Sequence, residues 1–142
     1  MASLTLSDVQ TLLDAPSAAV LTTIRKDGSP LTSPVWYQWT GDAFEIVIAR
    51  DDVKLRHLER EPRCTLVIFE AVPPFRGVSV TADATVTRTD ITEHRRAVAR
   101  RYLGTQRGDR FVEQRAGKLG DLVTLVPAEP RVWDLTAILP DA

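Results

Sequence analysis

Short runs in which apolar and polar residues alternate recur along the chain, and this is the pattern of half-buried β-strands. The clearest run covers residues 78–87, where valines and alanines occupy every second position. Shorter runs predict further strands at residues 19–24, 35–40, 44–48, 122–126 and 132–135. Residues 63–70 are apolar on both faces, which predicts a central strand. Because these strands follow one another without crossover helices, the sequence predicts a mainly β fold, a closed or half-closed barrel of six to seven antiparallel strands with short helices.

Turn and cap residues set the boundaries between these elements. Asp27-Gly28 predicts a hairpin turn, because glycine accepts the positive φ that such a turn requires. Ser7 and Gln10 have the spacing of a capping box, which predicts a short helix that Pro16 ends. Two more helices are predicted, one over residues 51–61 and one from Asp90 or Thr92 to about Leu103. The polar, glycine-dotted segment 104–120 is expected to hold at most a short helix at residues 110–113.

The composition is that of a globular protein with one domain over residues 1–142. Hydrophobic residues make up 44% of the chain and charged residues 26%, and a formal net charge of −1 gives no general attraction for nucleic acid or an acidic membrane. No run has the length and apolarity of a membrane span or a secretory signal, so a cytoplasmic protein is expected. Cys64 lies in an apolar run and is expected to be a buried thiol.

Few residues suggest side-chain catalysis. His57 and His94 are the only histidines; both are expected at the surface, and neither has a partner at metal-ligand spacing, so no metal site is predicted. Neither a nucleophile elbow nor a phosphate-binding glycine motif occurs. Lys54 and Arg56 stand at a helix start directly after a strand, and are either part of a phosphate or carboxylate site or a solvated helix face. A second basic run, expected to be a solvated helix face, comprises Arg95, Arg96, Arg100 and Arg101.

Three ordered segments resemble the FMN-binding split β-barrel superfamily: residues 23–30 (TIRKDGSP), 33–37 (SPVWY) and 54–63 (KLRHLEREPR). Within it, the chain is most similar to the pyridoxamine 5′-phosphate oxidase-like branch of flavin and deazaflavin oxidoreductases, and the resemblance extends to residues 131–134. The resemblance implies an antiparallel split barrel that forms a homodimer with cofactor sites at the subunit interface, without a nucleic acid or membrane partner.

The resemblance also implies which residues hold the cofactor. Those beside the flavin ring are Thr32, Ser33, Pro34, Val35 and Trp36. Ile48, Ala49 and Arg50 lie beside the phosphate-bearing tail, and the phosphate itself is held by Lys54 at the helix start, with Arg56 nearby. A loop expected to reach a cofactor site from the partner chain or from its edge contains Phe75, Arg76 and Gly77.

The implied activity is hydride transfer between a reduced cofactor and an unsaturated organic acceptor. Val53 precedes Lys54, where pyridoxamine phosphate oxidases carry an arginine, so the chain looks more like members that use the deazaflavin coenzyme F420, with FMN second. The alternative is a protein that binds or carries a flavin, deazaflavin or haem without turnover. No catalytic side chain is predicted, because the cofactor carries the chemistry. The proton comes from solvent, or from Tyr37 if it faces the site, and Trp36 and Phe75 are expected to shape the acceptor pocket.

Overall fold

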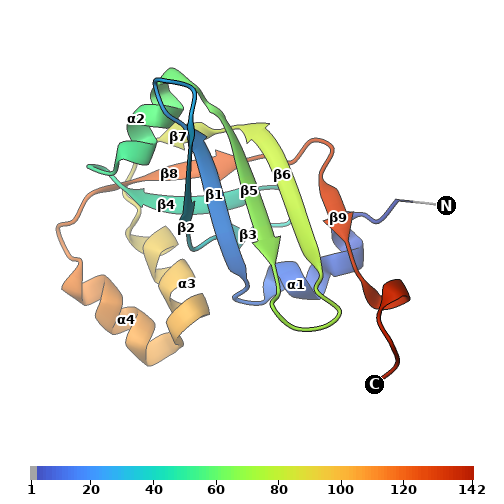
Figure 1. The fold of residues 1–142 in the computed structure, drawn as a ribbon. Coiled ribbons are helices and arrows are strands. Elements are labelled where there is room, and N and C mark those ends of the chain that lie inside the picture. The colour runs from blue at the N-terminus through green and yellow to red at the C-terminus, as the bar shows by residue number, and fades with distance from the viewer. Residues whose placement is uncertain (1–2) are drawn as a thin grey trace.

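The computed structural model describes residues 3–142, in which nine strands form two antiparallel sheets (Figure 1). The five-stranded sheet has the order β2-β1-β5-β6-β9, and the four-stranded sheet has the order β3-β4-β8-β7. The strands are β1 (Ala18–Ile24), β2 (Pro30–Pro34), β3 (Gln38–Trp39), β4 (Phe44–Ala49), β5 (Arg63–Phe69), β6 (Gly77–Asp83), β7 (Thr85–Thr87), β8 (Gly120–Leu125) and β9 (Arg131–Trp133). The helical elements are η1 (Leu6–Val9), α1 (Gln10–Asp14), α2 (Val53–Arg60), α3 (Thr92–Leu103), α4 (Thr105–Gln114) and η2 (Thr136–Ile138). Among the described residues, no helix combines the length and apolarity needed to cross a membrane.

The predicted long strand at residues 78–87 is divided between the two sheets. Its first part is β6 and its second part is β7, which belong to different sheets. Between them, the N–H of Ala84 donates to the carbonyl of Pro62 (2.8 Å), beyond the last β5–β6 pair. The chain therefore turns a barrel corner while its apolar alternation continues, which is one reason why the expected six to seven strands become nine.

The predicted strand at residues 35–40 is paired over only two residues. The N–H of Val35 still donates to the carbonyl of Ala19 (3.0 Å), but ladder pairing resumes only at β3, with β4. The segment between β2 and β3 thus passes from one sheet to the other. Every second side chain of this segment still faces inward, since Tyr37 is fully buried and Val35 and Trp39 pack against the core.

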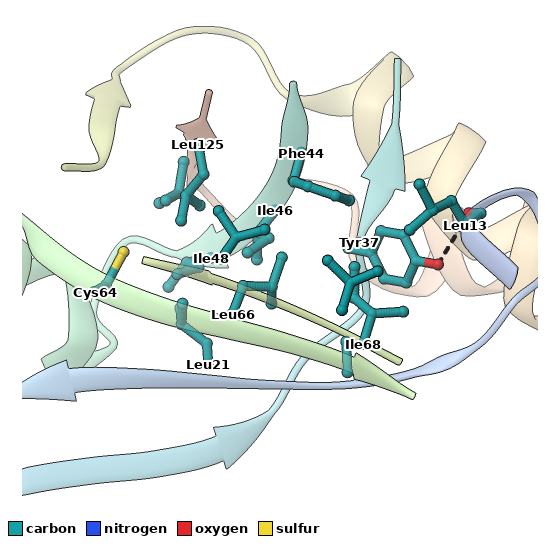
Figure 2. Packing of buried hydrophobic residues seen from close by; sticks show 14 of the residues in the cluster. Leu13, Leu21, Tyr37, Phe44, Ile46, Ile48, Cys64, Leu66, Ile68 and Leu125 are labelled. Carbon is teal, nitrogen blue, oxygen red and sulfur yellow. Dashed lines mark hydrogen bonds between the residues drawn. The ribbon is translucent and has the colours of Figure 1, made fainter. Parts of the chain in front are cut away.

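The core lies between the two sheets, as Figure 2 shows. Along β4 and β5 every second side chain is buried, and these inward residues are Phe44, Ile46, Ile48, Cys64, Leu66 and Ile68. Burial of each large aliphatic or aromatic side chain contributes about 1.5–3 kcal/mol. Strand β5 occupies the middle of its sheet, so its prediction as a central strand is confirmed.

Helix α1 closes the lower end of the barrel in Figure 1. The N-cap of the preceding turn is Thr5, not the predicted Ser7, and the N–H of Thr5 donates to the carboxylate of Asp8 (2.7 Å). The hydroxyl of Tyr37 donates to the carbonyl of Leu13 in α1 (2.9 Å; Figure 2). Tyr37 therefore connects the core to the end of this helix.

Helix α2 covers the barrel end that carries the β1–β2 turn (Figure 1), and it begins and ends where the sequence predicts. The surface position predicted for His57 is wrong: this residue is 6% exposed on the inner face of α2. Its Nδ1 lies 2.9 Å from Oγ1 of Thr23 in β1. Burial lowers the pKa of His57 below its usual 6.5, because the charged form cannot be solvated there.

Helices α3 and α4 pack against one another at the side of the barrel (Figure 1). The prediction of at most a short helix in segment 104–120 is wrong, since α4 runs for ten residues. Gly108 allows the close packing, because a Cβ there would lie 2.6 Å from the backbone nitrogen of Arg100. The helix pair therefore depends on the absence of a side chain at one position.

The arginines of α3 are not the solvated face that their run predicted. Arg101 donates to the carbonyls of Leu13 and Asp14 at the end of α1 (2.6 and 3.0 Å). Arg100 donates two hydrogen bonds to the carboxylate of Asp109 in α4 (2.8 and 3.0 Å). These side chains fix α3 to its two neighbouring helices.

Candidate functional site

A cavity of about 230 Å³ lies where four segments distant in sequence meet. The segment that follows β2 and the end of β4 supply one side of it. The start of α2 and the α3–α4 pair supply the rest. The cavity therefore combines barrel backbone with helix side chains, which is the usual setting of small-molecule sites.

Trp36 forms an aromatic wall of this cavity. Its ring stacks on Tyr102 of α3, with centroids 5.2 Å apart and planes 9° apart, and it meets Phe111 of α4 at 5.3 Å. The hydroxyl of Tyr102 donates to the carbonyl of Ser17 (2.9 Å), which fixes the supporting ring. Aromatic pairs at these separations add about 0.5–1.5 kcal/mol each, so the wall is held in one position.

The start of α2 supplies a cation and its carboxylate partner. Asp52 is the N-cap, and its Oδ1 accepts the N–H of Lys54 (2.8 Å). The Nζ of Lys54 lies 3.0 Å from the other oxygen of Asp52, and the two side chains are 14% and 30% exposed. An anion that approached Lys54 would therefore compete with Asp52.

Two arginines that the sequence did not assign to a site line the opposite part of the cavity. Arg95 is 8% exposed and donates to the carbonyl of Lys118 (2.9 Å). Arg115, at the end of α4, places its guanidinium 5.4 Å from the ring centroid of Phe111. Burial, together with the nearby charge of Arg115, lowers the pKa of Arg95.

Six of the thirteen predicted cofactor residues line this cavity: Pro34, Val35, Trp36, Ile48, Ala49 and Lys54. Thr32 instead shares a hydrogen bond with Thr22 on the outer face of the sheet (2.8 Å). Among the described residues, the buried hydroxyl of Ser33 has no hydrogen-bond partner. The structure thus brings together the last three residues of the predicted ring segment and the predicted lysine.

Arg50 and Arg56 line a different cleft, and Arg50 also borders an open cleft that shares Ala49 and Arg115 with the cavity. The Nε of Arg50 lies 3.0 Å from Asp121, which is 4% exposed and also lies 3.8 Å from Arg88. Within one chain neither arginine lines the cavity that contains Lys54. Their assignment to the cofactor phosphate stays a prediction.

Phe75 and Arg76 lie in the β5–β6 loop, Gly77 begins β6, and none of the three lines this cavity. The β5–β6 loop lies near α1 (Figure 1). Arg76 donates to both carboxylate oxygens of Glu70 (2.9 Å each), and this ion pair holds the pKa of Glu70 below its usual value. Gly77 faces the ring of Trp133, which a Cβ would overlap. A role for this loop at a cofactor site, from the partner chain or from its edge, stays a prediction.

Tyr37 does not face the cavity. Its side chain is fully buried, its hydroxyl is occupied by the carbonyl of Leu13, and burial raises its pKa to about 12. Tyr37 was expected to donate the proton only if it faced the site, and this condition is not met. Cys64 is buried as predicted, with burial raising its pKa to about 11.

No group of three possible metal ligands occurs among histidine, cysteine, aspartate and glutamate side chains within residues 3–142. His94 lies 3.6 Å from the carboxylate of Glu45, and His57 is engaged by Thr23. Neither histidine lines the cavity.

Two antiparallel sheets joined at barrel corners, with short helices over the ends, define a split β-barrel. The chain belongs to the pyridoxamine 5′-phosphate oxidase family, whose model matches residues 6–133. This family includes oxidoreductases and binds flavins such as FMN.

Solved structures share this fold at low sequence identity. The conserved hypothetical protein Rv2991 from Mycobacterium tuberculosis is similar with a TM-score of 0.78 and 23% identity, over 98% of this chain and 91% of that one. A protein named F420 reductase gives a TM-score of 0.70 at 17% identity, over 85% and 94% of the two chains. A putative pyridoxamine 5′-phosphate oxidase from Listeria innocua gives 0.67 at 13% identity, over 89% and 95%. No curated protein matches the chain by sequence.

Proposed function

We propose that this protein is an oxidoreductase that transfers a hydride between reduced coenzyme F420, or FMN as the second choice, and an unsaturated organic acceptor. The observation that carries the proposal is the meeting of the Trp36 strand segment and Lys54 in one cavity. Membership of the family supports a flavin-type cofactor, and likeness to a protein named F420 reductase supports the deazaflavin.

The residues of the cavity suit a flat ring with an acidic tail. Strand β2 is at the edge of its sheet, so within residues 3–142 no strand pairs with its free side, and the backbone groups there can bind polar atoms at a ring edge. Lys54 lies at a helix N-terminus, where backbone N–H groups favour a phosphate. The cavity of about 230 Å³ is smaller than the roughly 300–1,000 Å³ of typical ligand sites, so one chain supplies only part of the site.

A second copy of the chain would supply the rest, and we propose a homodimer. Val20, Val67 and Phe69 point outward from the five-stranded sheet and are only partly exposed, so this face offers apolar surface for a partner. The loop that carries Phe75 and Arg76 lies away from its own cavity. We expect it to approach the cavity of the partner.

When bound, the cofactor supplies the hydride chemistry. The chain itself holds and orients the cofactor. The fixed ring of Trp36 limits one side of the cavity, and Lys54 anchors the acidic end of the cofactor. The carboxylate of Asp52 is committed to Lys54, so we propose that solvent provides the proton that completes reduction of the acceptor. Trp36 is expected to influence which acceptors fit.

The test has two steps. The ligand that copurifies is identified by absorbance and mass, and FMN and F420 are then titrated separately into the stripped protein. Next, each reduced cofactor is mixed with a panel of enones and quinones, and its enzyme-dependent oxidation is followed optically. Binding followed by turnover supports the proposal. Tight binding without turnover across the panel would favour the alternative, a protein that binds or carries the cofactor.

A further inference from the structure

The part of the cavity formed by α3 and α4 carries two arginines and no carboxylate, although a second cleft that both arginines also border contains Asp90 and Glu113. Arg95 and Arg115 both line it, and the only carboxylate in the lining, Asp52, is paired with Lys54. Within residues 3–142, no acidic side chain lies within ion-pair distance of either guanidinium, although other arginines of the same helix have such partners. A balanced structural ion pair therefore does not explain the two arginines.

The backbone of the α4–β8 connection holds Arg95 in place. Its Nη1 donates to the carbonyls of Lys118 and Arg115 (2.9 and 3.4 Å), so a charged side chain that is more than nine-tenths buried has neutral acceptors only. Burying an uncompensated cation is costly, and proximity to Arg115 adds repulsion, as the lowered pKa of Arg95 reflects. An anion between the two guanidinium groups would remove both costs.

Arg115 is accessible as well as unpaired. Its guanidinium lies over the ring of Phe111, 5.4 Å from the centroid, and makes no hydrogen bond within residues 3–142. Beyond Arg115 the cavity adjoins an open cleft that also touches Ala49, Arg50 and Lys118, with Asp51 as its carboxylate. A ligand in the cavity can therefore extend past Arg115 toward solvent.

We propose that Arg115, backed by the buried Arg95, forms a second anion site that binds a carboxylate or phosphate group of the ligand. This site is separate from Lys54 and comes from α3 and α4 rather than from the strand and helix start on which the cofactor assignment depends. The proposal rests on the proposed function in treating the cavity as the ligand site. The anion belongs either to the acceptor, which is then an unsaturated acid, or to an acidic tail of the cofactor.

The deciding experiment uses the full chain and needs no cofactor. Inorganic phosphate and succinate are titrated at constant ionic strength while the arginine Nε–H resonances are followed by NMR, with the Arg115→Gln spectrum assigning the Arg115 signal. The matched control is Arg110→Gln, which removes an exposed arginine of the same helix that lines none of the described cavities. We expect saturable binding in the wild type and the control, and an apparent Kd at least about tenfold higher in Arg115→Gln, as for loss of a hydrogen bond to a charged group.

Equal anion affinities in Arg115→Gln and Arg110→Gln would overturn the proposal, which would leave Arg115 as a cation that balances the C-terminal dipole of α4. Arg95 is not the residue to substitute first, because its buried contacts make misfolding a competing explanation. If no cofactor binds at all, the proposed function fails while the anion titration still decides this proposal.

A second arm assigns the source of the anion. If it belongs to the acceptor, Arg115→Gln should raise KM about tenfold for an enone carboxylic acid but less than twofold for its methyl ester, with cofactor affinity unchanged. If it belongs to the cofactor, the Kd of F420, whose acidic tail carries carboxylates besides the phosphate, should rise about tenfold, while that of FMN, whose single phosphate is assigned to Lys54, stays the same. Either pattern supports the anion site.

Discussion

Substitutions at Lys54 and at Asp52 should have opposite effects on the affinity for an anionic cofactor. Lys54→Ala removes the cation at the start of α2, and loss of a hydrogen bond to a charged group costs about 1.5–3 kcal/mol, or about 10- to 150-fold in Kd for FMN and F420. Riboflavin, which has no phosphate, should lose much less. The selective loss distinguishes a phosphate contact from general damage to the cavity.

Asp52→Asn should strengthen binding instead. The ion pair between Nζ of Lys54 and Oδ2 of Asp52 spans 3.0 Å, and the two side chains are 14% and 30% exposed. A partly exposed pair is worth up to about 1 kcal/mol, which Lys54 gives up when it turns to a phosphate. Asparagine is as good an N-cap as aspartate, so α2 should persist while Kd falls by up to about fivefold.

Isothermal titration calorimetry measures these affinities, and thermal unfolding confirms that each variant is folded. Lys26→Ala is the matched control, because Lys26 lies exposed in the β1–β2 turn and should bind like the wild type. Arg56→Gln tests the other basic residue of α2, which lines a separate cleft. An affinity within twofold of the wild type in Lys54→Ala, for both cofactors, would refute the phosphate assignment.

Four further outcomes follow from the fold. Sedimentation should show a homodimer of twice the 15.8 kDa chain, and a monomer at every concentration contradicts this. Arg101→Gln should lower the free energy of unfolding in urea by about 2–3 kcal/mol, because carbonyls of α1 lose a charged donor, and Arg100→Gln should cost much less. The free energy of unfolding should fall as the pH drops through 6.5, since the unfolded chain protonates His57 first, and His57→Gln should flatten that region of the profile. Gly77→Ala should cost about 1–3 kcal/mol, measured in the same way, because its Cβ overlaps the ring of Trp133.

Apolar alternation predicted which face of a strand is buried better than it predicted which strands pair with one another. In β4 it identified the buried residues, because this strand has one face on the core, whereas in β5 the apolar residues on both faces did not show which side is buried. In residues 78–87 the same alternation continued through Ala84, where the chain changes sheets. Periodicity records which side of a strand is buried, and both sheets bury their inner side against the same core. The apolar alternation of the sequence therefore does not reveal the barrel corner.

The full length of α4 was not predicted because its sequence has only a weak preference for helix. It contains Gly108, and glycine in a helix costs about 0.5–1 kcal/mol relative to alanine. The compensation is tertiary, because Gly108 permits contact with the backbone of α3 at Arg100. One local signal was present, since Phe111 and Arg115 have the i,i+4 spacing that places two side chains on one helical face.

This omission also determined which half of the candidate site could be predicted. The strand segment at Trp36 and the helix start at Lys54 were accessible from sequence, because each lies within one short, recognisable segment. Phe111, Arg95 and Arg115 join the cavity only after α3 and α4 pack together. If the cofactor occupies the strand and helix-start side, the acceptor must enter next to α3 and α4. Substrate preference should then depend on these helices, so substitutions at Phe111 and Arg115 should change the acceptor range more than substitutions at Ala49 do.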